Sequence, residues 1–191
     1  MTDLLELTDF LDADECAALR AELASTAGVT ATVLSAKVEG SVMAQVRRTT
    51  RIACPAEVSE RIRARLISRK AELETHFALS LSDCEAPQFL RYETGDFFVP
   101  HQDGNTPLVH DHSRFRRISV VLFLSAPSAE PIEGTYGGGA LVLHGSYASP
   151  TAPVSVNPEP GTLVAFRSET THEVRPVTHG ERYTIVSWFR V

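Results

Sequence analysis

The sequence contains little cysteine. Its 191 residues include only three, Cys16, Cys54 and Cys84. An odd number at wide spacing excludes a disulfide framework, and no pair has the CxxC spacing of a zinc site. We therefore interpret them as buried thiols of a protein in the reducing cytoplasm.

The sequence also lacks an excess of basic residues and any long apolar run. There are 18 basic and 24 acidic side chains, and the formal net charge is −6. This balance argues against a large basic face for duplex nucleic acid or anionic lipid. No apolar run approaches about 18 residues, so we expect no transmembrane helix. The opening segment MTDLLELTDF has no basic residue, so we expect no signal peptide there.

What is present is an ordinary globular balance. The chain is 43% hydrophobic and 22% charged, which is enough to build a sizeable core. Its length predicts a single domain over residues 1–191, while no feature indicates the oligomeric state. The seven histidines are the feature that composition leaves to be explained.

Residues 1–86 predict a mixed region in which helices are prominent. Asp12 and Glu15 have the spacing of a capping box, and the helix formers behind them extend toward Gly28. The segments 29–40 and 46–55 are typical of strands because they are rich in Val, Thr and Ile. A second helix is predicted after Pro55, since apolar residues recur on one face: Val58, Ile62, Leu66, Leu73 and Phe77.

The second predicted helix also carries a run of basic side chains. These could form a nucleic-acid patch or the solvated face of an amphipathic helix, and the acidic total favours the solvated face. The residues concerned are Arg61, Arg63, Arg65, Arg69 and Lys70.

From residue 87 onward the pattern changes to short apolar or alternating runs punctuated by Gly, Pro and Asn. Many short strands at even spacing predict a sandwich, a barrel or a jelly roll. The polar, Gly-rich stretch 126–139 predicts a long loop. The expected fold is therefore mainly β, with helices in its N-terminal part.

The most informative unit is His101-Gln102-Asp103, directly after DFFVP. Side chains two residues apart in an extended chain point the same way, so this segment presents an imidazole and a carboxylate together. A third ligand has to come from a distant strand, and His172 in SETTHEVRPV is a suitable candidate. Two histidines and one carboxylate make the facial triad of non-haem Fe(II) oxygenases, which leaves positions open for a chelating cosubstrate and dioxygen. Alone, an HxD pair is weak evidence, and an exposed polar loop would then be the favoured interpretation.

Arg182 strengthens the first interpretation. It follows His172 by ten residues, and the intervening 177–180 segment predicts a turn between two strands, which would bring Arg182 back beside His172. A buried arginine needs an anion, and a dicarboxylate cosubstrate supplies one. Thr184 lies two residues further on, so its hydroxyl can face the same carboxylate. A surface salt bridge is the alternative for Arg182.

With these residues in place, the segment 87–191 resembles the Fe(II)/2-oxoglutarate-dependent dioxygenases of the prolyl 4-hydroxylase-like branch, especially the PKHD-type hydroxylases. Four blocks match that family in order: PQFLRYETGDFFVPHQD, then RRISVVLFLSAP with YGGGALVL, then VNPEPGTLVAF, and finally THEVRPVTHGERYTIVSWF. Residues 1–86 match only loosely, as the mixed helical support that the family packs against its sheet.

The resemblance implies a double-stranded β-helix, a cupin-like jelly-roll core, over residues 87–191. It implies His101, Asp103 and His172 as ligands of Fe(II), with 2-oxoglutarate as cosubstrate, O2 as oxidant and ascorbate as an optional reductant. It implies Arg182 as the partner of the far carboxylate of 2-oxoglutarate. Tyr92 matches a tyrosine that often hydrogen-bonds the same cosubstrate, with a half-buried strand aromatic as the equal alternative. Thr184 is assigned to the same cosubstrate.

Two features depart from the family pattern. Gly104 follows the HxD unit where Asn is frequent, and Ala140 follows the glycines where Glu or Thr is frequent. His110, Asp111 and His112 could be read as a second metal site, although a solvated loop is the better interpretation. Trp188 could be core or substrate wall. His76, His144 and His179 carry no partner that suggests chemistry.

The resemblance implies hydroxylation of a C–H bond, with a prolyl residue in a protein or peptide as the favoured substrate. A free amino acid or other small metabolite is the alternative. A nucleic-acid demethylase is disfavoured by the acidic charge and by Arg190, which lies too far from Arg182 for that branch. A non-catalytic jelly-roll binding module is the alternative from another functional class. Such a module would have no need of the triad and Arg182 together.

Overall fold

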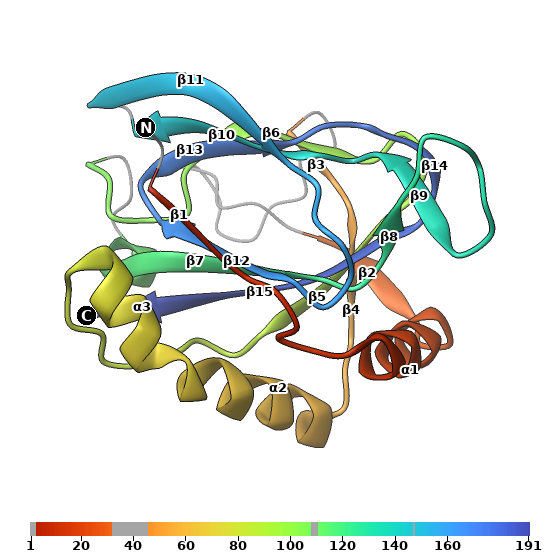
Figure 1. Ribbon diagram of the computed structural model, residues 1–191, viewed down its shortest axis with the longest axis horizontal. Coiled ribbons are helices and arrows are strands. Elements are labelled where there is room, and N and C mark those ends of the chain that lie inside the picture. Colours follow the sequence, from red (N-terminus) through yellow and green to blue (C-terminus); the bar gives the residue numbers. More distant parts are fainter. Residues whose placement is uncertain (1–2, 32–45, 108–110, 147) are drawn as a thin grey trace.

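The computed structural model describes residues 3–31, 46–107, 111–146 and 148–191. It has two facing β-sheets, with three helices packed on the outer face of the larger one (Figure 1). This confirms the expected class, a mainly β jelly-roll core with helical support.

The larger sheet has seven strands and contains both ends of the described chain. Its order is β1-β12-β7-β15-β5-β4-β2. The central pair is β7 with β15, and every neighbouring pair in it is antiparallel. The bounds are Leu4–Leu7 for β1, Leu163–Arg167 for β12, Arg116–Phe123 for β7, Arg182–Arg190 for β15, Gln88–Tyr92 for β5, Thr50–Ile52 for β4 and Gly28–Thr30 for β2.

The smaller facing sheet has five strands, and a third sheet lies at one end of the barrel (Figure 1). The five-stranded order is β11-β10-β13-β6-β3, and the three-stranded order is β14-β9-β8. The bounds are Ser149–Val156 for β11, Leu141–Ser146 for β10, Thr170–Val174 for β13, Phe97–His101 for β6, Arg47–Arg48 for β3, Val177–Gly180 for β14, Thr135–Gly138 for β9 and Ala126–Pro127 for β8.

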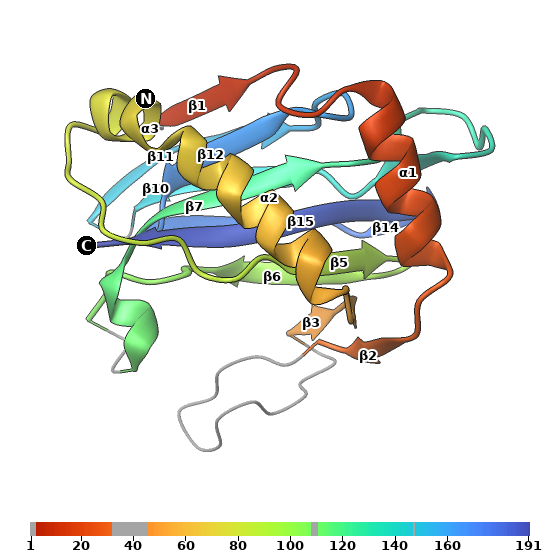
Figure 2. The same ribbon diagram turned by 90° about the horizontal axis from the view of Figure 1, so that it is seen from below.

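The helices cover the seven-stranded sheet on the side away from the barrel interior (Figure 2). Helix α1 is Ala13–Ala24, and its Asp12–Glu15 capping box forms as predicted. The helix predicted after Pro55 is interrupted at Arg69, so that α2 spans Ala56–Ser68 and α3 spans Lys70–Phe77. A short 3-10 helix, η1, covers His112–Phe115. The predicted apolar face is buried throughout: Val58, Ile62, Leu66, Leu73 and Phe77.

Side chains along the central strands alternate between two faces, so each strand contributes to two separate apolar clusters. On β7, Ile118, Val120 and Leu122 pack against the helices, whereas Val121 and Phe123 face the other sheet. The same period of two on β15 directs Tyr183 and Ile185 to the helices. Arg182 and Thr184 therefore point into the space between the sheets, which is where a barrel site has to be built.

Three local predictions are wrong. The 126–139 segment is not one loop, because β8 and β9 lie at its two ends and pair in parallel. The 177–180 segment is the strand β14 rather than a turn, since it pairs with β9. Helix α1 ends at Ala24, so Gly28 lies beyond it, in β2. Most of the strand predicted over 29–40 lies outside the described residues.

Two of the three cysteines are buried as predicted, whereas Cys54 is only partly buried. The basic run agrees with its interpretation as a solvated face. Cys16 and Cys84 are buried free thiols, and burial raises the pKa of each to about 11, so neither is a thiolate at neutral pH. The basic run of α2 and α3 is largely paired with acids: Arg63 with Asp83, Arg65 with Glu15, Arg69 with Glu72, and Lys70 with Glu74. Among the described residues, no helix is both long and apolar enough to cross a membrane.

Candidate metal centre

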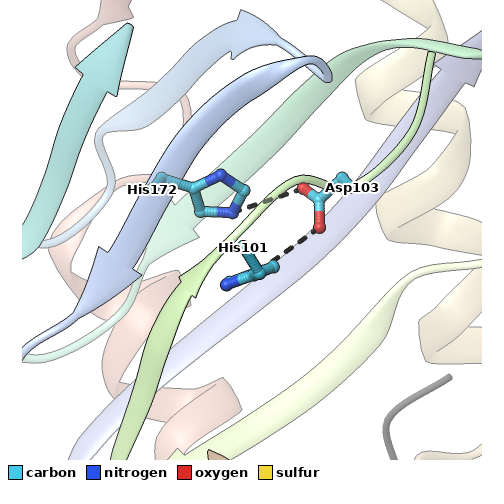
Figure 3. Close-up of side chains that lie close together, drawn as sticks. All are labelled: His101, Asp103 and His172. Carbon is cyan, nitrogen blue, oxygen red and sulfur yellow. Dashed lines mark ion pairs between the residues drawn. The ribbon is translucent and has the colours of Figure 1, made fainter. Parts of the chain in front are cut away.

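His101, Asp103 and His172 converge on one point in the barrel (Figure 3). The histidine Nε2 atoms lie 3.6 Å (His101) and 3.5 Å (His172) from the two carboxylate oxygens of Asp103. One ligand atom from each residue lies within 4.8 Å of the others. Two imidazoles and one carboxylate on one face leave the opposite side of a metal ion open, which is the donor set typical of non-haem Fe(II).

Strand pairing explains how residues so far apart in sequence meet. β13 runs antiparallel to β6, and His172 lies directly opposite His101 in the register. The ring centroids of the two histidines are 4.2 Å apart. The predicted i, i+2 relation brings Asp103 to the same point, although Asp103 lies just beyond the end of β6 rather than within it.

Both histidine rings are oriented by backbone carbonyl groups. Nδ1 of His101 lies 2.9 Å from the carbonyl oxygen of Val99, and Nδ1 of His172 lies 2.9 Å from that of Thr170. A carbonyl only accepts, so each Nδ1 carries the proton and each Nε2 presents its lone pair to the centre. This is the tautomer that a metal ligand requires.

Asp103 is held by a network of hydrogen bonds. The hydroxyl of Ser119 donates to Oδ2 of Asp103 at 2.7 Å, and the hydroxyl of Ser168 lies 3.0 Å from that of Ser119. The backbone N–H of Asp103 donates to the carbonyl of Ser168 at 3.0 Å. Arg116 donates to the Asp103 carbonyl at 3.3 Å and is itself paired with Glu85 at 2.7 Å. The carboxylate therefore has little freedom to turn away.

The charges at the centre suit metal binding. Burial would raise the pKa of Asp103, but the neighbouring His172 and His101 rings and a hydrogen bond from Trp188 outweigh it, so this pKa falls well below its usual range. Burial, together with nearby His101, lowers the pKa of His172 to about 4 against the opposing effect of Asp103. At neutral pH the site offers an ionised carboxylate and a neutral His172.

Arg182 lies in the same barrel interior and has no anionic partner. It is 1% exposed, and its guanidinium carbon lies 5.2 Å from the ring centre of Tyr92 and 5.0 Å from that of Phe123. No carboxylate among the described residues lies within 4.0 Å, and Nε and Nη2 have no hydrogen-bond partner there. A buried positive charge is costly without an anion. The two free N–H groups share one edge of the fork and match a carboxylate in geometry.

The structure places Tyr92 and Thr184 beside Arg182. Tyr92 lies opposite Arg182 in the β5–β15 register, and its ring is buried against the guanidinium. The hydroxyl of Thr184 accepts a hydrogen bond from Nη1 of Arg182 at 3.4 Å. Arg182 does not return beside His172 on a neighbouring strand, because β15 belongs to the seven-stranded sheet and β13 to the sheet facing it.

Two contributors to the site lacked a sequence signal. Ser119 is one polar residue inside the apolar run of β7, and only its register with the triad reveals its role. Tyr136 is fully buried near Arg182 on β9, inside the segment that its glycines marked as a loop.

Among the described residues, the remaining histidines are not part of the metal centre. His76 pairs with Asp3, His144 with Glu173, and His179 with the carbonyl of Glu130. Asp111 caps η1 by accepting from Ser113, whereas His110 lies outside the described residues. Trp188 is buried with the guanidinium of Arg116 stacked on its ring at 3.7 Å.

Comparison with known proteins decides the family. A model of the 2OG-Fe(II) oxygenase superfamily matches residues 87–190, just over half of the chain. The chain belongs to the 2OG-Fe(II) oxygenase superfamily. The matched segment contains the metal centre and Arg182, so the superfamily match and the geometry concern the same residues.

Among curated proteins, this superfamily member is similar to PKHD-type hydroxylases. It is 31% identical over 133 residues to one from Shewanella sp. (strain MR-7), covering 70% of this chain and 54% of that protein. It is 33% identical over 103 residues to one from Burkholderia ambifaria (strain MC40-6), covering 53% of this chain and 41% of that protein. The chain thus spans about half the length of the curated relatives it matches, or less.

Solved structures of prolyl hydroxylases share the fold. A Pseudomonas putida prolyl-4-hydroxylase superposes with a TM-score of 0.70 at 25% identity, covering 100% of this chain and 93% of that one. A Trichoplax adhaerens prolyl hydroxylase, solved with a hypoxia inducible factor peptide fragment, also has a TM-score of 0.70, at 18% identity, with 100% and 84% covered. The double-stranded β-helix expected from the sequence is confirmed by this likeness.

The residues present fit the cofactors that the superfamily name implies. Two imidazole nitrogens and one ionised carboxylate suit Fe(II). The orphaned Nε and Nη2 of Arg182 suit the distal carboxylate of 2-oxoglutarate. Fe(II) thus fits the ligand atoms of the triad, and 2-oxoglutarate fits the N–H groups of Arg182 that have no partner among the described residues.

Proposed function

We propose that the protein is an Fe(II)- and 2-oxoglutarate-dependent dioxygenase that hydroxylates a C–H bond. The observation that carries this proposal is a buried guanidinium without an anion, in the same interior as two histidines and an aspartate. A metal site alone would fit many functions. The buried cation of Arg182 indicates an anionic cosubstrate. A 2-oxo dicarboxylate can bind the metal at one end and Arg182 at the other.

In this proposal His101, Asp103 and His172 hold the iron, and Arg182 holds the distal carboxylate of 2-oxoglutarate. Iron and 2-oxoglutarate supply activation of O2, so that one oxygen atom enters the substrate as hydroxyl and the other enters succinate as CO2 is lost. The protein supplies orientation: the carbonyls of Val99 and Thr170 aim the histidine nitrogens. The rings of Tyr92 and Phe123 keep water from the guanidinium. Ascorbate would serve only as an auxiliary reductant.

A prolyl residue in a protein or peptide is the favoured substrate. Support comes from the fold shared with prolyl hydroxylases, one of them solved with a peptide fragment, and from the similarity to PKHD-type hydroxylases. A free amino acid or other small metabolite is the second candidate, since the same chemistry at the centre would serve it. The three free thiols favour a reducing compartment such as the cytoplasm.

A non-catalytic jelly-roll module is the rival from another class. It accounts poorly for Arg182, because a buried cation without a partner costs stability that a binding module has no reason to bear. The triad would be equally unexplained, with both histidines held in the ligating tautomer.

The test is succinate formation by the purified protein with Fe(II), 2-oxoglutarate and O2, against a panel of prolyl peptides and free amino acids. We expect succinate that depends on Fe(II) and rises with one class of substrate. His101→Ala should abolish turnover through loss of iron, and Arg182→Ala should chiefly raise the KM for 2-oxoglutarate. If the wild-type protein binds neither iron nor 2-oxoglutarate, the proposal fails.

A further inference from the structure

Tyr136 lies in the three-stranded sheet at one end of the barrel, and its place in the matched block YGGGALVL gave it no role of its own. It is 0% exposed and belongs to β9, in the three-stranded sheet beside the barrel. Its hydroxyl donates to Oδ1 of Asn157 at 2.5 Å. Asn157 follows β11, so this bond ties the three-stranded sheet to the end of a strand in the five-stranded one.

Tyr136 and Arg182 converge over Gly139. A Cβ atom at Gly139 would lie 2.9 Å from Cδ of Arg182 and 3.1 Å from Cε2 of Tyr136, so both side chains occupy the space that the missing Cβ leaves. Burial raises the pKa of the Tyr136 hydroxyl, and the positive charge of Arg182 offsets part of that rise. The shared space over Gly139 and the effect of Arg182 on this pKa both indicate that the phenol lies close to the guanidinium.

The guanidinium of Arg182 has one nitrogen with a hydrogen-bond partner and two without one among the described residues. Nη1 donates to Thr184, while Nε and Nη2 have no partner among the described residues. The phenolic proton of Tyr136 is committed to Asn157, so its lone pairs are what it can offer to a cation. A donor-only guanidinium needs such an acceptor if it is to keep its free edge aimed in one direction.

We propose that Tyr136 is a positioning residue for Arg182, which with Asn157 sets how tightly the distal carboxylate of the cosubstrate is held. The inference rests on the proposed function, because it takes 2-oxoglutarate as the ligand of Arg182. Tyr136 acts through the arginine rather than on the metal end of the cosubstrate. Its effect should therefore depend on the presence of a second carboxylate.

The experiment is anaerobic calorimetry of the Fe(II)-loaded protein with two 2-oxo acids, 2-oxoglutarate and 2-oxobutyrate, which lacks the distal carboxylate. Tyr136→Phe removes only the hydroxyl. We expect it to weaken 2-oxoglutarate by about three- to tenfold, the usual effect of one hydrogen bond, and to leave the affinity for 2-oxobutyrate unchanged. Equal weakening of both acids, or of neither, would overturn the inference.

Two further variants separate the possible failures. Asn157 is exposed, so Asn157→Ala should fold and gives an answer even if Tyr136→Phe does not fold. We expect Asn157→Ala to weaken the affinity for 2-oxoglutarate about two- to threefold. Unchanged 2-oxoglutarate affinity in this variant also counts against the inference. If Arg182→Ala loses 2-oxoglutarate but Tyr136→Phe does not, only the role of Tyr136 is wrong. If the wild-type protein does not bind 2-oxoglutarate, the proposed function itself fails.

Discussion

Two backbone carbonyl groups determine which nitrogen each histidine presents at the metal centre. His101 bonds to a carbonyl two residues before it, and so does His172. The same local device on two adjacent strands gives two rings with Nε2 directed inward. Because backbone carbonyls are the partners of both Nδ1 atoms, the orientation of the two rings depends on strand geometry and not on a further side-chain motif.

At the residue scale, Ser119→Ala should weaken iron binding. The Ser119 hydroxyl donates to Asp103, and removing a hydrogen bond to a metal ligand costs about tenfold in affinity. The measurement is the Fe(II) dissociation constant under anaerobic conditions, by competition with a chelator.

Ser187→Ala is the matched control for that experiment. Ser187 is equally buried on the neighbouring strand β15, but its hydroxyl donates to the carbonyl of Glu85 and does not touch a ligand. We expect its iron affinity to equal that of the wild type. If both variants lose iron equally, Ser119 acts through general stability and not through Asp103.

Residue spacing could predict part of the site but not all of it. The HxD pair was predictable because period two in an extended chain presents both side chains together. Arg182 was predictable as an anion partner, yet its position in the facing sheet was not, since sheet membership depends on long-range pairing. Ser119 and Tyr136 gave no spacing signal, because each depends on which strand comes to lie opposite.

At the element scale, helix signals were more reliable than loop signals. The capping box at Asp12 forms as predicted, because both of its bonds are local to one turn. The break at Arg69 was hidden because the apolar period continues across it from α2 into α3. The strand β9 was hidden because a Gly-rich composition is common to loops and to strands that approach other backbone closely. The strand β14 was hidden because it is only four residues long and ends in Gly, as a turn between two strands would.

Asp12→Ala should destabilise the protein by about 1 kcal/mol. The Glu15 N–H donates to Oδ1 of Asp12 at 2.8 Å, and the Asp12 N–H donates to Oε2 of Glu15 at 3.0 Å. The variant loses the first of these bonds with the Asp12 carboxylate, whereas the backbone N–H of residue 12 can still donate to Glu15. The measurement is the free energy of unfolding in urea.

Asp14→Ala controls for charge in the same turn. Asp14 is an acid of the first turn that makes no capping bond, so we expect a loss of about 0.3 kcal/mol from its interaction with the helix dipole. Equal losses in the two variants would contradict the role assigned to the capping box.

At the scale of the whole molecule, the helices and the barrel share one core. The largest apolar cluster joins Leu19 of α1 and Leu73 of α3 to Ile118, Leu163 and Phe189 of the seven-stranded sheet. We propose that residues 1–191 form one cooperative domain, since neither part can bury its apolar face without the other. The support region 1–86 also contributes β1, β2 and β4 to that sheet.

Cooperativity predicts that two probes report one unfolding transition. Trp188 lies in the barrel and its fluorescence follows the barrel, whereas far-UV circular dichroism also follows the helices. Leu73→Ala, at a fully buried site of α3, should lower the stability by about 3 kcal/mol and shift both signals together. A helix transition that separates from the fluorescence transition would contradict the single domain.

The central claim is that a metal triad and a lone arginine in one barrel hold iron and 2-oxoglutarate together. Anaerobic absorption spectroscopy tests it most directly. Adding 2-oxoglutarate to the Fe(II) protein should produce a weak visible charge-transfer band that is absent in Asp103→Ala and needs a far higher 2-oxoglutarate concentration in Arg182→Ala. No band in the wild-type protein, or the same titration curve in Arg182→Ala, would contradict the account.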